Sequence, residues 1–390
     1  MMAATMTHRE RVLAALSHRE PDRVPVDLGG TVDTSIHVLA HEQLKRHLGI
    51  ATTTEPRIIH RMMQVAEVDE AILQHFDVDT RCVCAGQPDH SLSREIDEHT
   101  YQDEWGVVRR KPSGGYWYDQ ERGPLAGEIT IANIVNYPWP DPHDPGRVRG
   151  ILPRIEHLRC TTDCALVLQL PSAFVHVSQY LRGFEDWFVD TARDQRLIGT
   201  LFDAVLEVNM ATAGEILKVA GHLVDVVMTA DDIGDQNGPM VSPQVYRKLF
   251  KPRHRAYFQS IRDRTPAPIL FHSCGSLYKL MEDLIEIGVQ AVTPVQVNAG
   301  DMETGRLKRE FGDRVAFWGA VDTQHVLPFG TVEDVRFEVH RRIQDLAPGG
   351  GYILSAVHNI QPEVPPENIC AMFEAAQTFG VRDVEKRKPT

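Results

Sequence analysis

Eight short apolar runs, each followed by a longer stretch of helical periodicity, constrain the fold of this chain more than any other feature. The runs cover residues 23–29, 81–86, 165–172, 224–232, 268–274, 291–296, 314–322 and 352–358. Strands that alternate with helices in this way form βαβ units with a parallel sheet. Eight such units close most simply into a (β/α)8 TIM barrel. An open doubly wound sheet is the alternative, but no glycine-rich dinucleotide fingerprint follows the first run.

The segments between the runs carry helix boundary signals. Thr331 is expected to cap a helix that runs to Leu346, because a threonine hydroxyl can accept from the first free N–H groups. Pro365 is expected to open the last helix and Gly380 to end it. Further helices are expected over residues 184–220 (as two helices), 242–261 and 276–288.

One polar, proline-rich and aromatic segment, residues 87–147, interrupts this rhythm between the second and third strands. Within it, residues 105–110 and 116–119 are predicted to pair as a β-hairpin around Ser113-Gly114-Gly115. We therefore expect a single barrel domain over residues 1–390, with an inserted β-hairpin subdomain that lies over the barrel mouth and shapes access to it. The alternative is a decoration of the surface without a role at the site.

Composition excludes several classes of protein. A formal net charge of -13 argues against nucleic-acid binding, which needs a basic surface. No apolar run approaches the roughly 20 residues that cross a bilayer, and the first residues lack the apolar core of a signal peptide. We therefore expect a cytoplasmic protein that does not associate with membranes. The six cysteines are too scattered for a disulfide framework or a structural zinc knot.

The barrel prediction also locates the functional residues, because the active sites of such barrels lie at the C-terminal ends of the strands. The chemically capable residues at those positions are Asp27, Cys84, Asp231, Asp232, His272, Cys274, Gln296, Asn298, Asp322 and His358.

His272 and Cys274 form the strongest pair in this set. Strand side chains alternate between faces, so positions two apart point the same way. An imidazole beside a thiolate suits zinc, and a catalytic zinc needs about three protein ligands. The third ligand could be His358 at the end of strand eight, or Asp231 or Asp232 on strand four. The competing interpretation is a buried histidine and a buried cysteine that only pack.

The remaining candidates have less specific roles. Asp27, Asp232 and Asp322 are candidate catalytic carboxylates, as proton carriers or substrate anchors. Asp27 could instead belong to a turn, and Asp322 could cap a loop. Candidates for substrate binding are Gln296, Asn298 and Trp117. His37 and His176 could reach the mouth, but a lone histidine is more often structural.

Four segments carry a resemblance to a known family. They are THRERVLAALSHREPDRVPVD near the start, LRGFEDWFVDTA in the middle, FHSCGS at strand five, and GGGYILSAVHNIQPEVPPEN near the end. Together they resemble the uroporphyrinogen decarboxylase superfamily over nearly the whole chain apart from the insertion. The resemblance implies a (β/α)8 barrel, in agreement with the strand count.

Two branches of that superfamily are relevant. The true decarboxylases carry an arginine-rich stretch soon after the first strand, whereas no arginine occurs here between Arg23 and Arg46. The zinc-dependent, corrinoid-linked methyltransferases carry an H-x-C pair on strand five, which His272 and Cys274 match, and a later cysteine on strand eight. His358 stands in place of that cysteine here, which would change the ligand set to two histidines and one cysteine.

The second branch implies a methyltransferase that moves a methyl group between a small molecule, either a methylated or methoxylated compound or a thiol, and a corrinoid. Its cofactors would be zinc and a cobalamin-type corrinoid. The corrinoid would arrive on a partner protein, because the D-x-H-x-x-G match at Asp141–Gly146 lies in a proline-rich loop and not between a strand and a helix. A second copy of the chain, as a homodimer, is a further candidate partner.

Two other functions stay open from the sequence. A metal-free decarboxylase or lyase of a smaller carboxylated substrate would need a basic pocket, built by Arg182 or by Arg109 and Arg110 of the insertion. A non-enzymatic binding barrel would have a pocket without converging acids.

Overall fold

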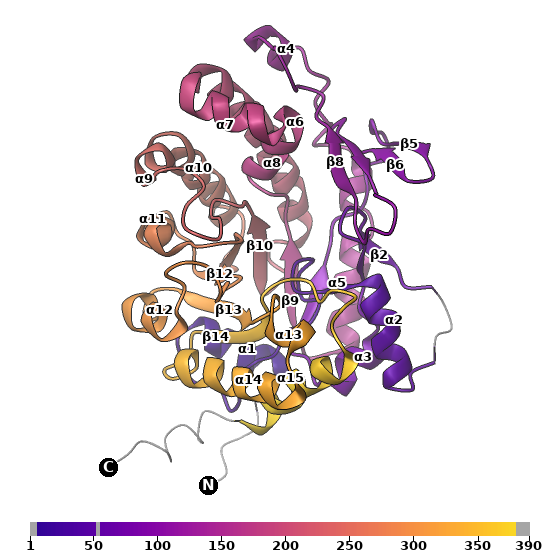
Figure 1. Ribbon diagram of the computed structural model, residues 1–390, viewed down its shortest axis with the longest axis vertical. Coiled ribbons are helices and arrows are strands. Elements are labelled where there is room, and N and C mark those ends of the chain that lie inside the picture. Colours follow the sequence, from indigo (N-terminus) through magenta and orange to yellow (C-terminus); the bar gives the residue numbers. More distant parts are fainter. Residues whose placement is uncertain (1–5, 52–54, 380–390) are drawn as a thin grey trace.

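A parallel sheet of seven strands forms the centre of the computed structural model, which describes residues 6–51 and 55–379 (Figure 1). The strands follow the order β14-β13-β12-β11-β10-β9-β4, so each neighbours the next along the chain. Their bounds are β4 (Thr80–Val83), β9 (Ala165–Gln169), β10 (Val226–Ala230), β11 (Ile269–His272), β12 (Ala291–Thr293), β13 (Ala316–Val321) and β14 (Tyr352–Ala356).

The chain around Val26 lies between the two edge strands of this sheet. Val26 forms a parallel bridge with Leu354 of β14, and its carbonyl accepts from the N–H of Asp79, which immediately precedes β4. The predicted strand over residues 23–29 is therefore wrong in extent, since it is reduced to this one bridge. Pro25 has no N–H to donate, which shortens the ladder. The TIM barrel fold itself is confirmed.

Side chains alternate between two hydrophobic layers along the barrel strands. One layer fills the barrel interior and includes Val167, Met228, Leu270, Trp318 and Ile353, together with Val12 and Ala15 of α1 (His8–Leu16). The other layer packs the outer faces of the strands against the surrounding helices. Because both faces are covered, the strands are apolar throughout, as parallel strands usually are.

The remaining helices surround the barrel. They are α2 (Val38–His47), α3 (Glu70–His75), α4 (Ile131–Val135), α5 (Ile151–Thr161), α6 (Val175–Arg182), α7 (Phe184–Arg193), α8 (Gln195–Ala220), α9 (Pro243–Val245), α10 (Lys251–Arg262), α11 (Met281–Glu286), α12 (Thr304–Phe311), α13 (Val326–Phe329), α14 (Val332–Leu346) and α15 (Pro366–Thr378). Three short turns of other helix types are η1 (Pro145–Val148), η2 (Tyr246–Phe250) and η3 (Tyr278–Leu280).

Most of the predicted helices are present. The two helices expected over residues 184–220 are α7 and α8, and the hydroxyl of Thr331 caps α14 by accepting from the N–H of Asp334. The helix expected over residues 276–288 is shorter, because η3 precedes α11. Gly380, the expected end of the last helix, lies outside the described residues.

Helix α8 is a single apolar helix of 26 residues. An 18-residue window within it reaches a mean hydropathy of 1.2, which by length and composition would suffice to cross a membrane. However, 67% of that window is buried inside the protein. This burial is typical of a core helix of a globular protein.

The segment before β9 forms a four-stranded antiparallel sheet in the order β5-β6-β7-β8, with β5 (Arg94–Asp97), β6 (Thr100–Gln102), β7 (Val108–Arg110) and β8 (Asp119–Arg122). The predicted hairpin corresponds to the pairing of β7 with β8, where Arg110 faces Asp119. Its second strand begins three residues later than predicted, because the N–H of Tyr118 donates to the carbonyl of Met62 and not to β7. Whether residues 87–147 form a separate subdomain stays a prediction.

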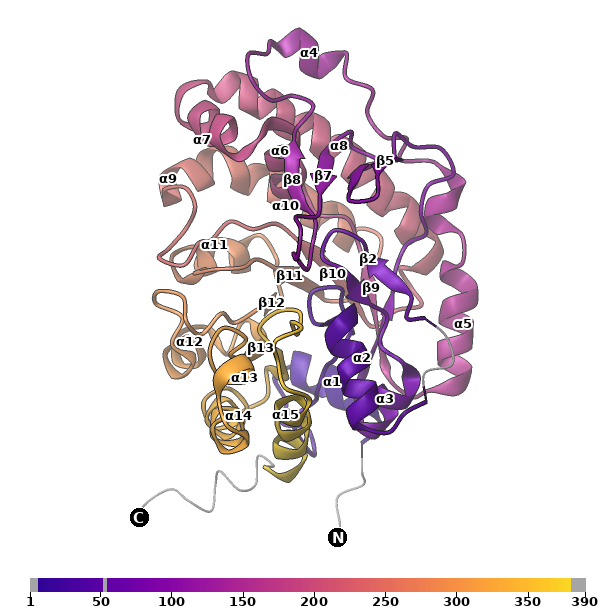
Figure 2. The same ribbon diagram turned by 45° about the vertical axis from the view of Figure 1, so that its right-hand side comes forward.

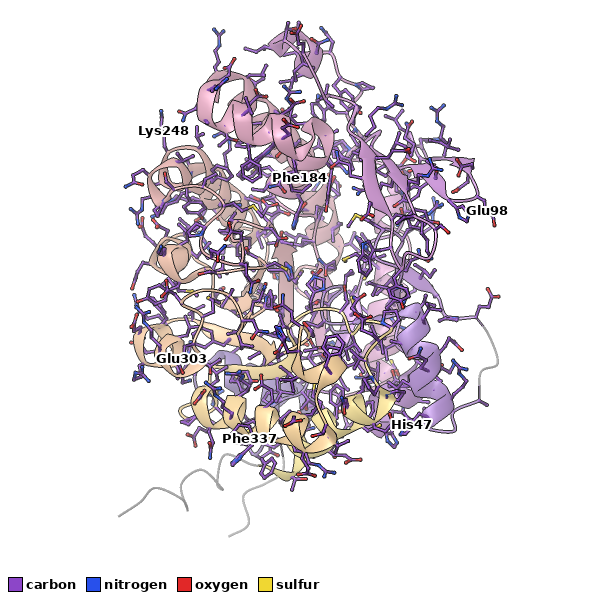
Figure 3. The ribbon with its side chains drawn as sticks, in the orientation of Figure 1. His47, Glu98, Phe184, Lys248, Glu303 and Phe337 are labelled. Atoms are coloured by element: carbon purple, nitrogen blue, oxygen red, sulfur yellow. The ribbon has the colours of Figure 1, made fainter. Side chains whose placement is uncertain are left out.

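A smaller antiparallel sheet, β1-β3-β2, lies beside this segment and consists of β1 (Ile36–His37), β2 (Ile58–His60) and β3 (Val65–Ala66). Figures 1 and 2 both place the β5–β8 sheet away from α14 and α15. In Figure 3, Glu98 at the turn between β5 and β6 lies at the upper right, and Phe337 of α14 lies at the lower end.

Candidate active site at the barrel mouth

A cavity of about 780 Å³ lies at the C-terminal ends of the barrel strands. Gln169, Ala230 and His272, the last residues of β9, β10 and β11, line its barrel side. Residues of the β5–β8 segment line the opposite side, among them Tyr101, Asp103, Trp105, Val107 and Arg109. The insertion therefore forms part of the wall of the cavity.

Three potential metal ligands, His272, Cys274 and His358, converge at this mouth. One ligand atom from each lies within 4.8 Å of the other two. Nε2 of His272 and Sγ of Cys274 are 3.5 Å apart, and the rings of His272 and His358 meet edge to face with centroids 5.6 Å apart. The sequence predicted these three residues as ligands, and the structure brings them together.

The turn after β11 positions Cys274. Strand β11 ends at His272, and Gly275 follows with a φ of 82°, in the left-handed region that favours glycine. A Cβ at Gly275 would lie 2.5 Å from the backbone of Gly234, so no other residue fits here without movement. The N–H of Cys274 donates to the carboxylate of Asp232 over 2.7 Å, which fixes the turn from the neighbouring strand end.

The donor set fits a zinc ion. Two imidazoles and one thiol are the nitrogen and sulfur ligands that zinc accepts. The His272 side chain is buried, and its Nδ1 has no hydrogen-bond partner within the described structure. Its Nε2 lies 3.5 Å from Sγ of Cys274 and is therefore the nitrogen placed to share a metal with the thiol. Burial also lowers the pKa of His358 and thereby keeps its ring in the neutral form that binds metals.

Asp33 is a residue of this site that the sequence analysis missed. Its Oδ2 lies 3.7 Å from Nδ1 of His272, and its Oδ1 lies 4.0 Å from Nε2 of His358. Histidines that bind metals almost always face a carboxylate, carbonyl or water with their other nitrogen, which fixes the ring and its tautomer. Asp33 lies where it could serve both rings. Its only signal in the sequence is a carboxylate shortly after Gly29-Gly30.

Asp232 and His176 form an ion pair in the cavity wall, with Oδ2 of Asp232 3.1 Å from Nε2 of His176. Burial disfavours the charged form of His176, but the attraction of Asp232, Asp231 and Asp33 outweighs it and raises the pKa of His176 to about 9. Burial likewise opposes ionisation of Asp232, but His176 holds the pKa of Asp232 well below its usual range. At neutral pH the pair is therefore charged. His176 is a part of the site and not the isolated structural histidine that the sequence favoured.

The thiol of Cys274 is protonated in this environment. Burial raises its pKa well above the usual value, and the negative charges of Asp232 and Asp33 raise it further. A bound cation would invert this balance, because a metal deprotonates a coordinating thiol. The two carboxylates therefore suit a site that holds a positive charge.

Comparison with known proteins identifies the family. The model of the uroporphyrinogen decarboxylase (URO-D) family matches residues 115–379. The chain belongs to this family.

Curated relatives of this URO-D family member match over part of their length. The uroporphyrinogen decarboxylase of Pseudoalteromonas translucida is 35% identical over 178 residues, which are 42% of this chain and 48% of the relative. That of Alkalilimnicola ehrlichii is 34% identical over 83 residues, or 21% of this chain and 22% of the relative. The matched regions thus span about half of these relatives or less.

Among solved structures, a methyltransferase from Methanosarcina mazei shares the fold over nearly its full length. The TM-score is 0.65 at 19% sequence identity, and the match covers 96% of this chain and 99% of the other. At this identity the likeness concerns the fold alone. It agrees with the URO-D barrel described above.

Asp231 and Asp232 of this URO-D protein differ in role, a choice that the sequence left open. Asp231 is fully buried and accepts from the N–H groups of Phe174 and Val175 at the start of α6, and from Nε2 of His254. Its oxygens are therefore occupied by the scaffold. Asp232 lines the cavity and is the acid available to the site.

Two of the predicted catalytic carboxylates do not line the cavity. Asp27 is buried, and its oxygens accept from Trp318 Nε1, Thr80 Oγ1 and the N–H of Gly30. Burial raises the pKa of Asp27 in spite of these bonds. Asp322 accepts from backbone N–H groups of its own loop, as in the loop-capping alternative. Both acids support the backbone where they stand.

The predicted substrate-binding residues also lie outside the lining of the cavity. Gln296 accepts from the N–H of Gly275 and thus supports the turn that carries Cys274. Asn298 is 3.2 Å from Nδ1 of His325 on the neighbouring loop. The side chain of Trp117 is exposed beside Tyr116. Of these residues only Gln296 acts on the site, and it does so through the backbone.

His60 of β2 is a second cavity residue that the sequence analysis missed. Burial lowers its pKa to about 4, so the ring is neutral. Its Nδ1 accepts from the N–H of Met63. No local sequence signal marks it, because it reaches the cavity only through the path of the chain between β1 and β4.

Proposed function

We propose that this URO-D family protein is a methyltransferase that moves a methyl group between a small molecule and a corrinoid carried on a partner protein. The observation that carries the proposal is the convergence of His272, Cys274 and His358 within 4.8 Å at the mouth of a barrel. In this proposal the three side chains hold a zinc ion. The fold shared with the Methanosarcina mazei methyltransferase supports it.

A zinc ion held there would act as a Lewis acid that lowers the pKa of a bound thiol or hydroxyl, or polarises a leaving atom. The residues of this chain provide its setting. Asp33 faces His272 and His358 and orients both rings. Asp232 accepts from the N–H of Cys274 and so holds the turn that keeps the thiol beside Nε2 of His272.

His176 is the residue suited to carry a proton in this reaction. Its pKa of about 9 keeps it protonated at neutral pH, and it lines the cavity beside Asp232. When a methyl group leaves an oxygen or sulfur of the substrate, His176 can hold or return the proton that this atom requires. Val32, Leu170 and Val177 form an apolar part of the cavity wall against which a methyl group could pack.

The alternative, decarboxylation of a carboxylated substrate without a metal, has weaker support. Of the arginines proposed for its basic pocket, only Arg109 lines the cavity, and it pairs with Asp103 at 2.9 Å. Arg61, the other arginine in the described lining, pairs with Glu95. Arg182 is buried and bonded to Asp190 and nearby carbonyls. These cations are neutralised by protein carboxylates before any substrate binds.

Metal analysis of the purified full-length protein tests the proposal. We expect about one zinc per chain, and its loss in Cys274→Ser with the fold retained by circular dichroism. Cys160→Ser is the matched control, because Cys160 is an exposed cysteine on α5 and should not alter the metal content. Well-folded wild-type protein that takes up no zinc on addition would contradict the metal site.

A second measurement tests the reaction itself. Free cob(I)alamin can stand in for the corrinoid of the partner protein, and methyl transfer from a panel of methoxylated and methylated compounds changes its absorption spectrum. We expect turnover with at least one member of the panel, abolished in His272→Ala. Absence of methyl transfer, combined with release of carbon dioxide from a carboxylated substrate by the metal-free protein, would favour the alternative.

A further inference from the structure

A pair of cysteines outside the active site, Cys82 and Cys84, has no place in the function proposed above. Both stand at the C-terminal end of β4, two positions apart, so their side chains project from the same side of the strand. Their sulfur atoms are in contact, with Sγ of Cys82 3.1 Å from Sγ of Cys84. Both side chains are half-buried and thus reachable from solvent.

The two thiols line a cavity of their own, of about 160 Å³. It is distinct from the active-site cavity, with which it shares only Ile59 among the described lining residues. A small reagent can therefore reach the thiols without passing the site of His272 and Cys274.

Arginines give this second cavity a positive rim. Arg57 and Arg154 both pair with one carboxylate, that of Glu67, at 3.2 and 3.0 Å. One positive charge of this group therefore remains without a partner of its own. Arg149, which is mostly exposed, also lines the cavity and pairs with Asp89 at its edge. The rim suits a ligand that carries carboxylates.

The two thiols differ in acidity. The hydrogen bond from Cys82 lowers the pKa of Cys84 against the opposing effects of burial and of the Glu67 carboxylate, and Arg57 and Arg154 make smaller contributions that also lower it. The same hydrogen bond raises the pKa of Cys82. The pair thus consists of one sulfur prepared to attack as a thiolate and one that stays a thiol, which is the arrangement of a dithiol in thiol–disulfide exchange.

We propose that Cys82 and Cys84 form a redox-active dithiol that is oxidised by small disulfides bearing carboxylates. The Cys84 thiolate attacks one sulfur of the small disulfide, forms a mixed disulfide and releases the first thiolate. Cys82 then loses its proton and attacks Cys84 Sγ, which forms the intramolecular disulfide and releases the second thiolate. One small disulfide becomes two thiols, and the two protein thiols lose two electrons and two protons.

The spacing of the pair makes this oxidation reversible. Two residues along a strand span about 6.4–6.8 Å between Cα atoms. That is the upper end of the range of about 4.4–6.8 Å that disulfides tolerate, and strained disulfides are more easily reduced. We therefore expect the oxidised pair to return to dithiol with a modest excess of a monothiol.

The test uses reduced full-length protein treated with oxidised glutathione, followed by intact mass and peptide mapping. We expect a loss of two hydrogens that maps to Cys82 and Cys84. Cys82→Ser should accumulate a glutathione adduct on Cys84, and Cys84→Ser should form neither the adduct nor the disulfide at this position. Exposed Cys160 serves as an internal standard of reactivity. Free thiols at both Cys82 and Cys84 after Cys160 has been modified would overturn the proposal.

A cationic disulfide tests the part of the proposal that concerns charge. At low ionic strength we expect oxidised glutathione to react about threefold or more faster than cystamine, because the free positive charge attracts the carboxylates. Arg154→Gln should reduce this preference, since it leaves Glu67 matched to Arg57 alone. Equal rates for the two disulfides in the wild type would show that the rim does not select for carboxylates. Zinc content and methyl transfer are separate readouts, so either proposal can fail alone.

Discussion

Two groups of strand ends around the barrel mouth carry polar residues, and these residues have different partners: the ligand group comprises the ends of β10, β11 and β14, and the loop group comprises the ends of β12 and β13. After β10, β11 and β14, side chains of Asp232, His272 and His358 face one another across the cavity. After β12 and β13, Gln296 and Asp322 bond to backbone N–H groups of the mouth loops. The ligand group is arranged around the cavity, and the loop group bonds to the mouth loops.

The difference lies in what satisfies each polar group. Oδ1 of Asp322 accepts two backbone N–H groups within three residues of itself, and its Oδ2 lies 3.6 Å from Nδ1 of His325, so the carboxylate is engaged by its own loop. His272 has a buried Nδ1 without any partner in the described structure. A strand-end position alone therefore does not make a residue functional. The functional residues are those whose hydrogen-bonding capacity the scaffold leaves unused.

The largest effect on activity is expected when a carboxylate is removed from the ligand group of strand ends. Asp232→Ala frees the N–H of Cys274 and the ring of His176, and we expect methyl transfer to fall by about 10–100-fold, as for other residues that orient metal ligands. Asp322→Ala in the loop group is the matched control. It should keep activity within about twofold and lose about 1 kcal/mol of unfolding free energy through the lost loop cap. Equal losses of activity in the two variants would show that the ligand group and the loop group do not differ in function.

A smaller effect is expected for Asp33→Asn, which keeps the size of the side chain and removes its charge. Because Asp33 faces both His272 and His358, we expect zinc affinity to fall by about tenfold with the fold unchanged. Competition with a chromogenic chelator measures this affinity directly. Unchanged affinity would mean that Asp33 does not orient either ring.

The ion pair between His176 and Asp232 predicts a dependence of stability on pH. The pKa of His176 is about 9 in the folded protein and about 6.5 in the unfolded chain, so its stabilising contribution is complete below about pH 6.5 and is lost as the pH rises through 9. We expect wild type to exceed His176→Gln by on the order of 1 kcal/mol at pH 6.5. This difference should disappear near pH 10.

Urea unfolding at several pH values, with a chelator present to exclude metal effects, measures this difference. A gap that stays constant from pH 6.5 to 10 would show that the charge of His176 does not contribute. The corresponding contribution of Asp232 is lost at the acid end, because its folded pKa lies below its usual value.

The smallest effect is expected for Trp117→Ala in the insertion. The side chain is 44% exposed and does not line the cavity, so substrate KM and kcat should each stay within about twofold. Steady-state kinetics with the best substrate of the panel measures both. A marked rise in KM would mean that the insertion moves Trp117 over the cavity when substrate binds.

The barrel and its ligand cluster could be predicted because they follow from local patterns. Apolar runs of strand length alternate with helices, and the pair two positions apart at the end of β11 must share a face. His358 could be added because strand eight ends at the same mouth as strand five. Each of these steps needs only the sequence and the barrel rule.

Asp33, His60 and the role of His176 could not be predicted, for a physical reason. They reach the cavity from a loop, from the end of β2 and from the start of α6, whose positions depend on how distant segments pack. The position of Asp27 outside the cavity lining could not be predicted for a related reason. A carboxylate at a strand end looks the same in sequence whether it faces a substrate or, as here, the indole N–H of Trp318.

The single bridge between Val26 and Leu354 has a consequence for the synthesis of this protein. The seam joins Val26 to Leu354, so the first residue cannot find its partner until the segment that contains the second has left the ribosome. At about 5–20 residues per second this delay lasts roughly tens of seconds. During that time the barrel cannot close, and its edge strands stay uncovered. Uncovered strand edges promote aggregation, so nascent chains depend most on chaperones in this period.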